Sequence, residues 1–167
     1  MKIVYFSIAI VTIVIDQITK WIASTNLAMH DPVPVMPSFN FTLMHNYGAA
    51  FSFLSDAGGW QRWFFTIVAA VISVVLVVWI IRLKAYEKWL GIGLSLVLGG
   101  AIGNLIDRLI YQYVVDFIHV FYGDYHFPHF NIADSAIFIG AVLLIAEAFN
   151  WPFLDTKLDT DTGPQTQ

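Results

Sequence analysis

Long apolar runs dominate this chain, and polar or aromatic segments separate them. Four runs are predicted to be helices, and each has roughly the 20 residues that a helix needs to cross the hydrocarbon core of a bilayer. They occupy residues 3–23, 63–81, 89–110 and 132–149. The second run carries no charge, which is typical of a lipid-facing helix. The pattern therefore predicts an all-α membrane protein with four transmembrane helices, in a single membrane-embedded domain of residues 1–150.

Two segments between the runs have patterns of their own. Within residues 24–59, the proline-rich stretch Asp31–Pro37 disfavours a helix and a central strand, whereas apolar and polar side chains alternate over Ser38–Asn46 as in a β-strand. Residues 107–131, which overlap the end of the third run, are rich in Tyr and Phe and suit the headgroup region of a membrane. We expect a small β-sheet on the outer surface with an interfacial segment beside it.

The basic residues are distributed unevenly between the two sides that four crossings create. Lys2, Arg82, Lys84, Lys88 and Lys157 lie on the side of both termini, and Arg62 and Arg108 lie on the other side. Because cytoplasmic segments are enriched in Lys and Arg, this asymmetry predicts that both termini are cytoplasmic. Residues 151–167 then form a cytoplasmic tail, which has little to bury and is expected to be disordered.

Composition narrows the class of protein further. Hydrophobic residues make up 58% of the chain and charged residues 12%, with a mean hydropathy of +0.70, whereas soluble domains carry about 25% charged residues. The chain has no cysteine, which excludes disulfides, thiolate zinc ligands and cysteine nucleophiles. The formal charge of −4 is too small to indicate a nucleic-acid partner.

Charged side chains in or beside a membrane span are costly, so each needs a partner or a function. Asp16 and Lys20 are four residues apart and share one helix face. They either form an ion pair that lets two charges share a helix end, or they support a functional site.

The end of the third run combines small and polar residues. Gly99 and Gly103 form a small-xxx-small face that predicts close helix packing. Asn104 and Arg108 share a face one turn further along. The arginine either extends to the membrane interface or takes part in a site.

Two further carboxylates are placed so that they converge at one depth. Asp116 follows the third run, and Asp134 begins the fourth. Paired carboxylates can divide the work of a hydrolase, one activating water and the other donating a proton. Asn131 and Asp134 equally fit an N-cap and an acid in the first turn of a helix, and Asp116 fits an ordinary exposed acid. The residue pattern leaves both interpretations open.

Other catalytic chemistries have weaker signals. The five histidines lack metal-ligand spacing and no His-Glu-x-x-His motif is present, so we expect no metal or other cofactor. Ser95 lacks the Gly-x-Ser-x-Gly pattern and is interpreted as a packing serine within the third run.

Five blocks of sequence, taken together and in order, resemble the signature blocks of lipoprotein signal peptidases (signal peptidase II), a family of bacterial aspartic peptidases. The blocks are DQITK (Asp16–Lys20), NYGAAFS (Asn46–Ser52), GGAIGNLIDR (Gly99–Arg108), VVDF (Val114–Phe117) and FNIADS (Phe130–Ser135). The resemblance covers nearly the whole chain except the tail.

The resemblance implies a specific activity and a set of site residues. Asp116 and Asp134 are expected to form a catalytic dyad. The residues expected to support the site or bind substrate are Asp16, Lys20, Asn46, Gly48, Asn104, Arg108 and Asn131. The implied substrate is a diacylglyceryl-modified prolipoprotein, cut on the amino side of its lipidated cysteine.

The resemblance also implies a location and partners. The protein is expected in the bacterial inner membrane, among membrane lipids, as a monomer, with its active site on the periplasmic side. A small transporter or proton relay is an alternative function that requires acids near the bilayer midplane. A non-catalytic membrane assembly factor is another, and it would tolerate loss of both aspartates.

Overall fold

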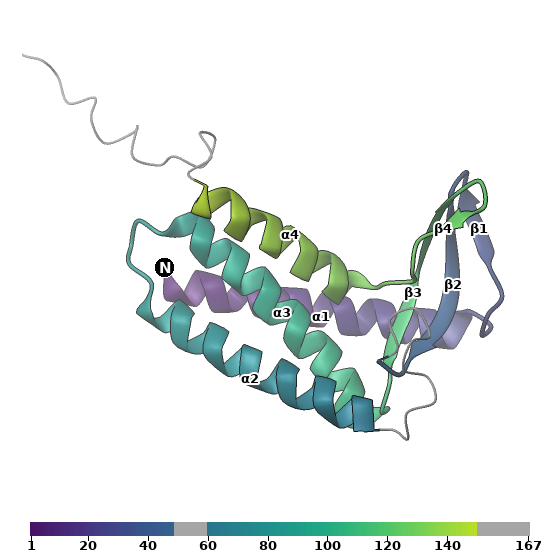
Figure 1. The fold of residues 1–167 in the computed structure, drawn as a ribbon, viewed down its shortest axis with the longest axis horizontal. Helices are drawn as coiled ribbons and strands as arrows, with labels where there is room; N and C mark the ends of the chain where they lie inside the picture. Colours follow the sequence, from purple (N-terminus) through teal and green to yellow (C-terminus); the bar gives the residue numbers. More distant parts are fainter. Residues whose placement is uncertain (49–59, 150–167) are drawn as a thin grey trace, which may run out of the picture.

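The computed structural model describes residues 1–48 and 60–149. The helices are α1 (Lys2–Asn26), α2 (Trp60–Arg82), α3 (Lys88–Ile110) and α4 (Ile132–Ala148), and the strands are β1 (Val33–Met36), β2 (Phe39–Asn46), β3 (Val114–Tyr122) and β4 (Tyr125–His126). The helices lie side by side, and the strands gather at the end of the bundle opposite the N-terminus (Figure 1). The predicted tail, residues 151–167, and part of the predicted outer segment 24–59 lie outside the described residues.

Within the described residues, three helices are long and apolar enough to cross a membrane. They are α1, residues 63–82 of α2, and α3. The fourth predicted run forms α4, which is also apolar but has 17 residues. The protein is therefore a helical membrane protein with a small antiparallel sheet. The many large apolar side chains exposed on α1 and α2 are typical of helices that face lipid.

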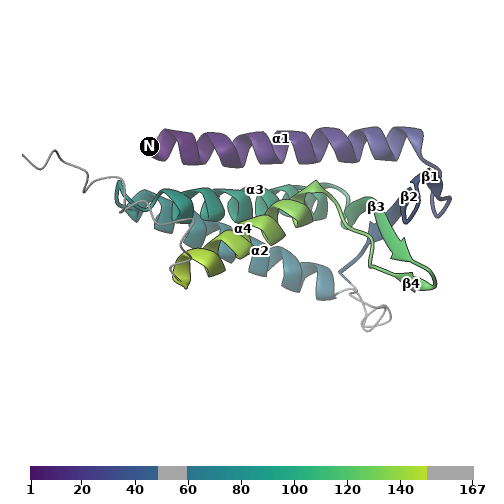
Figure 2. The same ribbon diagram turned by 90° about the horizontal axis from the view of Figure 1, so that it is seen from above.

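Helix α3 is the central helix, because it packs against each of the other three. Figure 2 shows α1 as a separate layer running along α3. The predicted close packing at Gly99 and Gly103 is confirmed: a Cβ at Gly99 would lie 2.9 Å from the Ala9 carbonyl oxygen, and one at Gly103 would lie 2.6 Å from Asp16 Oδ2. These glycines therefore allow α1 to bring its polar face against α3.

The sheet is antiparallel with the order β1-β2-β3-β4. The strand predicted at Ser38–Asn46 is confirmed as β2, which pairs with β3 so that Met44 is opposite Asp116. The proline-rich stretch contributes β1, an edge strand paired only with β2 among the described strands. An edge position suits this stretch because proline has no backbone N–H to donate to a neighbouring strand.

Residues 107–131, predicted as an interfacial segment, contain a strand that was not predicted from the sequence. Asp107 to Ile110 complete α3, and Val114–Tyr122 form β3, which lies inside the sheet and has four consecutive buried residues. The β-branched and aromatic residues of this stretch favour a strand. Aromatic residues equally suit a membrane interface, so the composition of the segment does not by itself indicate the strand.

A small apolar core attaches the sheet to the bundle. Val115 and Phe117 of β3 pack with Leu43 of β2 and with Ala23 near the end of α1. Because successive side chains of a strand alternate between faces, Asp116 is directed away from this core. The core therefore holds β3 so that Asp116 is directed towards the N-terminus of α4.

Candidate active site

Asn131 and Asp134 form the start of α4. The Asn131 side chain is the N-cap and accepts a hydrogen bond from the Asp134 backbone N–H at 2.9 Å. In return, Asp134 Oδ2 accepts from the Asn131 backbone N–H at 3.3 Å, which completes a capping box. The capping interpretation is thus confirmed, and it also sets the position of the Asp134 carboxylate.

Asp116 is a buried carboxylate bound by two amide groups. It is 2% exposed. Its Oδ1 accepts from Asn131 Nδ2 at 2.7 Å, and its Oδ2 accepts from Asn46 Nδ2 at 3.0 Å. Asn131 therefore contacts both aspartates, Asp116 through its side chain and Asp134 through its backbone, and it brings the two carboxylates into one site. The alternative of an ordinary exposed acid at position 116 is wrong.

Asn104 connects the second carboxylate to a buried cation. Its Nδ2 donates to Asp134 Oδ1 at 2.7 Å. Its Oδ1 accepts from Lys20 Nζ at 2.8 Å and from Asn131 Nδ2 at 3.2 Å. Because an ammonium group can only donate, the contact with Lys20 determines which end of the Asn104 amide faces Asp134.

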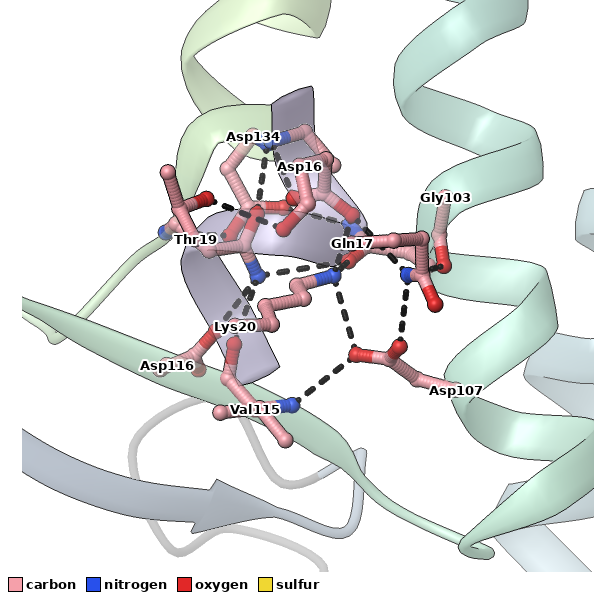
Figure 3. Close-up of polar contacts among 12 residues, drawn as sticks. Asp16, Gln17, Thr19, Lys20, Gly103, Asp107, Val115, Asp116 and Asp134 are labelled. Atoms are coloured by element: carbon pink, nitrogen blue, oxygen red, sulfur yellow. Dashed lines mark hydrogen bonds and ion pairs between the residues drawn. The ribbon is translucent and has the colours of Figure 1, made fainter. Parts of the chain in front are cut away.

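Lys20 is 3% exposed and lies between two carboxylates. Its Nζ is 2.9 Å from Asp16 Oδ2, which confirms the ion pair expected from spacing, and 2.9 Å from Asp107 Oδ2. The other oxygen of Asp16 accepts from the Ala133 backbone N–H at 2.8 Å. Figure 3 shows these side chains converging from α1, α3, β3 and α4. The Asp16–Lys20 pair of α1 thus links this helix to α3 through Asp107 and to α4 through Ala133.

Two residues of this cluster are not among the site residues expected from the sequence. Asp107 accepts hydrogen bonds from Gln17 Nε2 at 2.9 Å and from the Val115 backbone N–H at 3.1 Å. The sequence does carry a signal for Asp107, since a charge at the end of a membrane span requires a partner. No pattern in the sequence singles out Gln17.

The remaining expected residues lie around the dyad. Gly48 has a φ of 96°, a conformation that favours glycine, and its N–H donates to Asn46 Oδ1 at 2.9 Å. This contact directs the Asn46 amide nitrogen towards Asp116. Arg108 is half-buried; its Nη1 donates to the Asn104 carbonyl at 3.3 Å, and its guanidinium lies 5.8 Å from the centre of the Phe65 ring.

The electrostatic environment of Asp116 favours a shared proton. Burial, followed by the negative charge of Asp134, raises the pKa of Asp116 to about 7. Hydrogen bonds from Asn46 and Asn131 and the positive charge of Lys20 act in the opposite direction and lower this pKa, but by less. A carboxyl group with this pKa can exchange a proton near neutral pH. The pair can therefore present one ionised and one protonated carboxyl group.

Other chemistries lack comparable geometry. No group of three or more His, Cys, Asp or Glu side chains in residues 1–48 and 60–149 is arranged to hold a metal ion. Ser95 is fully buried and donates to the Gly91 carbonyl at 2.6 Å, which agrees with its interpretation as a packing serine.

Comparison with known proteins gives a consistent result. The chain matches the family model described as signal peptidase (SPase) II over residues 8–150. A lipoprotein signal peptidase of Acinetobacter baumannii is 56% identical over 148 residues, which cover 89% of this chain and 84% of that protein. A lipoprotein signal peptidase of Teredinibacter turnerae is 55% identical over 142 residues, which cover 84% of each chain.

A solved structure agrees in fold and sequence. A bacterial membrane enzyme, determined by the in meso method at 2.3 Å resolution, is 34% identical and superimposes with a TM-score of 0.78 over 98% of this chain and 93% of that chain. The family match covers all five sequence blocks in residues 8–150. The chain therefore belongs to the lipoprotein signal peptidase (signal peptidase II) family of aspartic peptidases, enzymes that remove signal peptides from prolipoproteins.

Proposed function

We propose that Asp116 and Asp134 are the catalytic dyad of this peptidase. The observation that carries this proposal is the bridging by Asn131, which contacts both carboxylates at 2.7 and 3.3 Å. Within the described part of the chain, neither aspartate forms a salt bridge, whereas Asp16 and Asp107 both pair with Lys20. Two carboxylates held close without a direct counter-ion retain a proton between them.

The proposed reaction uses both protonation states. The ionised carboxylate takes a proton from water as the water oxygen attacks the scissile carbonyl carbon. The protonated carboxyl group hydrogen-bonds the developing oxyanion, and a proton passes to the amine of the cysteine as the peptide bond breaks. The two groups titrate as one coupled unit, so the acid and base roles are not divided between the two residues.

The surrounding residues have supporting roles in this proposal. Asn46, Asn104 and Asn131 orient the dyad through the hydrogen bonds described above, and Gly48 orients Asn46. Asp16 and Lys20 hold the buried polar cluster together. Arg108 lines a cavity of about 200 Å³ with Trp63, Thr66, Leu109 and Gln112. In this proposal its charge orients the substrate backbone or the lipid head.

The pH dependence of cleavage tests the electrostatic part of the proposal. The hydrogen bond from Asn46 lowers the pKa of Asp116, so Asn46→Ala is expected to raise this pKa above its present value of about 7. The limb of the pH–kcat/KM profile that Asp116 governs should then move to higher pH. Asn26→Ala, at the exposed end of α1, serves as the control. A profile with both limbs unmoved in Asn46→Ala would count against Asp116 as a titrating member of the dyad.

We further propose that α4 is a fourth membrane span and that both termini are cytoplasmic. The N-terminus, the α2–α3 connection and the end of α4 lie at one end of the bundle, and the sheet lies at the other (Figure 1). Lys2, Lys84 and Lys88 belong to the first of these ends, where positive charge is expected on the cytoplasmic side. The dyad then lies near the periplasmic face of the inner membrane.

Single cysteines can test this topology because the native chain has none. Met36 and Tyr125 are exposed at the sheet end. We expect the variants Met36→Cys and Tyr125→Cys to react with a membrane-impermeant thiol reagent in cells with a permeable outer membrane. Ala85→Cys, in the α2–α3 connection, should react only after the inner membrane is opened. The reverse pattern of labelling would show that the orientation is wrong.

The proposed substrate is a prolipoprotein whose cysteine already carries diacylglycerol, and cleavage occurs on the amino side of that cysteine. Its acyl chains would hold the cysteine at the outer leaflet, where the dyad is proposed to lie, and the enzyme would act as a monomer among membrane lipids. The transporter and assembly-factor alternatives have no comparable support. Asp116 lies on β3, at the end of the bundle (Figure 1), not at mid-span as a relay would need.

A further inference from the structure

Asp16 and Asp107 make equivalent contacts on the two sides of the site. Asp16 Oδ1 accepts from the backbone N–H of Ala133 at 2.8 Å, and Asp107 Oδ2 accepts from the backbone N–H of Val115 at 3.1 Å. Ala133 directly precedes Asp134, and Val115 directly precedes Asp116. Each of the two carboxylates therefore holds the backbone N–H of the residue immediately before one aspartate of the proposed dyad.

Lys20 joins these two contacts into one unit. Its ammonium group lies 2.9 Å from Asp16 and 2.9 Å from Asp107 (Figure 3). All three side chains are at most 3% exposed, so their attraction is weakly screened by solvent. The separation of the two peptide groups is thus set by one short, charged bridge that runs from α4 through α1 and α3 to β3.

Further hydrogen bonds limit the movement of Asp107. Gln17 Nε2 donates to Asp107 Oδ1 at 2.9 Å and to the Gly103 carbonyl at 3.2 Å. Both oxygens of Asp107 are therefore engaged, and the carboxylate is held in one orientation. Hydrogen bonds with an ionised partner are roughly twice as strong as neutral ones, so the Val115 peptide group is held firmly.

We propose that Asp107 is a positioning residue: with Lys20 and Asp16 it forms a clamp that sets the distance and orientation between Asp116 and Asp134. This inference rests on the proposed dyad and adds a function for a residue outside it. Asp107 touches none of the reacting atoms in this account. Its effect passes through the Val115 peptide group to Asp116, and through Lys20 and Asn104 to Asp134.

Asp107→Asn is the first test, because it keeps the shape of the side chain but removes its charge. We expect kcat for a lipidated prolipoprotein to fall by about 10²-fold, the loss typical of a misplacement of about 1 Å. KM should change by less than about twofold, because binding groups are untouched. Asp124→Asn, in the exposed turn between β3 and β4, is the matched control and should keep wild-type kinetics.

The pH profile separates positioning from a general loss of stability. The positive charge of Lys20 lowers the pKa of Asp116. Of the two carboxylates that pair with Lys20 among the described residues, Asp107→Asn leaves only Asp16, so the charge of Lys20 is less neutralised and lowers the pKa of Asp116 further. The limb that Asp116 governs should therefore move to lower pH. Asp107→Glu keeps the charge but displaces the oxygens by one methylene, so its kcat should fall with no shift of the profile.

The outcomes distinguish this inference from the dyad itself. Wild-type kcat in both Asp107 variants, with Asp116→Asn inactive, would overturn the clamp and leave the dyad intact. Cleavage by Asp116→Asn would overturn the dyad whatever Asp107 does. The amount of folded protein is measured by thermal unfolding in detergent. The clamp would also be overturned if the loss of activity in the Asp107 variants matched a fall in folded protein and the pH profile of Asp107→Asn did not shift.

Discussion

Asp134→Asn and Asp116→Asn are each expected to reduce cleavage of a lipidated prolipoprotein by at least about 10²–10⁴-fold, the usual contribution of a general acid or base. An amide cannot exchange the proton that the reaction moves between water, the carboxyl groups and the leaving amine. The double variant should be scarcely less active than either single variant, as is expected of residues that act as one unit. Cleavage by purified variants at matched membrane content measures this effect.

The effect on folding must be measured alongside activity. In Asp134→Asn the helix cap should survive, because the new amide oxygen can still accept from the Asn131 backbone N–H. The new NH₂ group then faces Asn104 Nδ2, which donates to the Asp134 carboxylate at 2.7 Å in the native protein, and such a mismatch costs about 1–3 kcal/mol. Asp31→Asn, at an exposed position just before β1, is the control. Substantial cleavage by either dyad variant would contradict the proposed mechanism.

Removal of the lipid from the substrate is expected to have the second large effect. A prolipoprotein with diacylglycerol on its cysteine should be cut, whereas the unmodified precursor of identical sequence should give almost no product. Burial of acyl chains contributes about 0.8 kcal/mol per CH₂, so the lipid holds the cysteine at the membrane surface and limits the depths that its peptide bond samples. Such orientation lowers a barrier by several kcal/mol.

The experiment compares both precursors at equal concentration with purified enzyme in nanodiscs. The shortened product, separated by mass, gives the rate for each substrate. Asp134→Asn is included as the inactive control, so that cleavage by a contaminating protease is recognised. Equal rates for the two precursors would leave an aspartic peptidase in place but contradict the dependence on lipid.

Much of the helical architecture is predictable from the sequence. A membrane span must satisfy its backbone hydrogen bonds within one segment, so the apolar runs determine the helices locally. The predicted runs 3–23, 63–81 and 89–110 differ from α1, α2 and α3 by a few residues at their ends. The alternation over Ser38–Asn46 likewise predicts β2. That α4 crosses the membrane, and that residues 1–150 form one domain, remain predictions.

The interior strand β3 illustrates why the remaining fold is harder to predict. All of its first four residues, from Val114 to Phe117, are buried, so the strand lacks the alternation that identifies a half-buried strand. Its aromatic residues are equally typical of a membrane interface. The burial of this strand follows from its packing against α1 and α3 and its pairing with β2, and no local pattern contains that information.

The family, the two candidate catalytic aspartates and the contacts between near neighbours can all be inferred before the fold is known. The Asp16–Lys20 ion pair and the Asn131 cap are such contacts, because they follow from local helix geometry. Contacts between distant residues depend on the folded chain: Lys20 and Asn104 are 84 residues apart, and Asp16 and Ala133 are 117 apart. The role of Asp107 depends on such contacts, since its partners belong to α1 and β3 and meet it only when the helices and the sheet pack together.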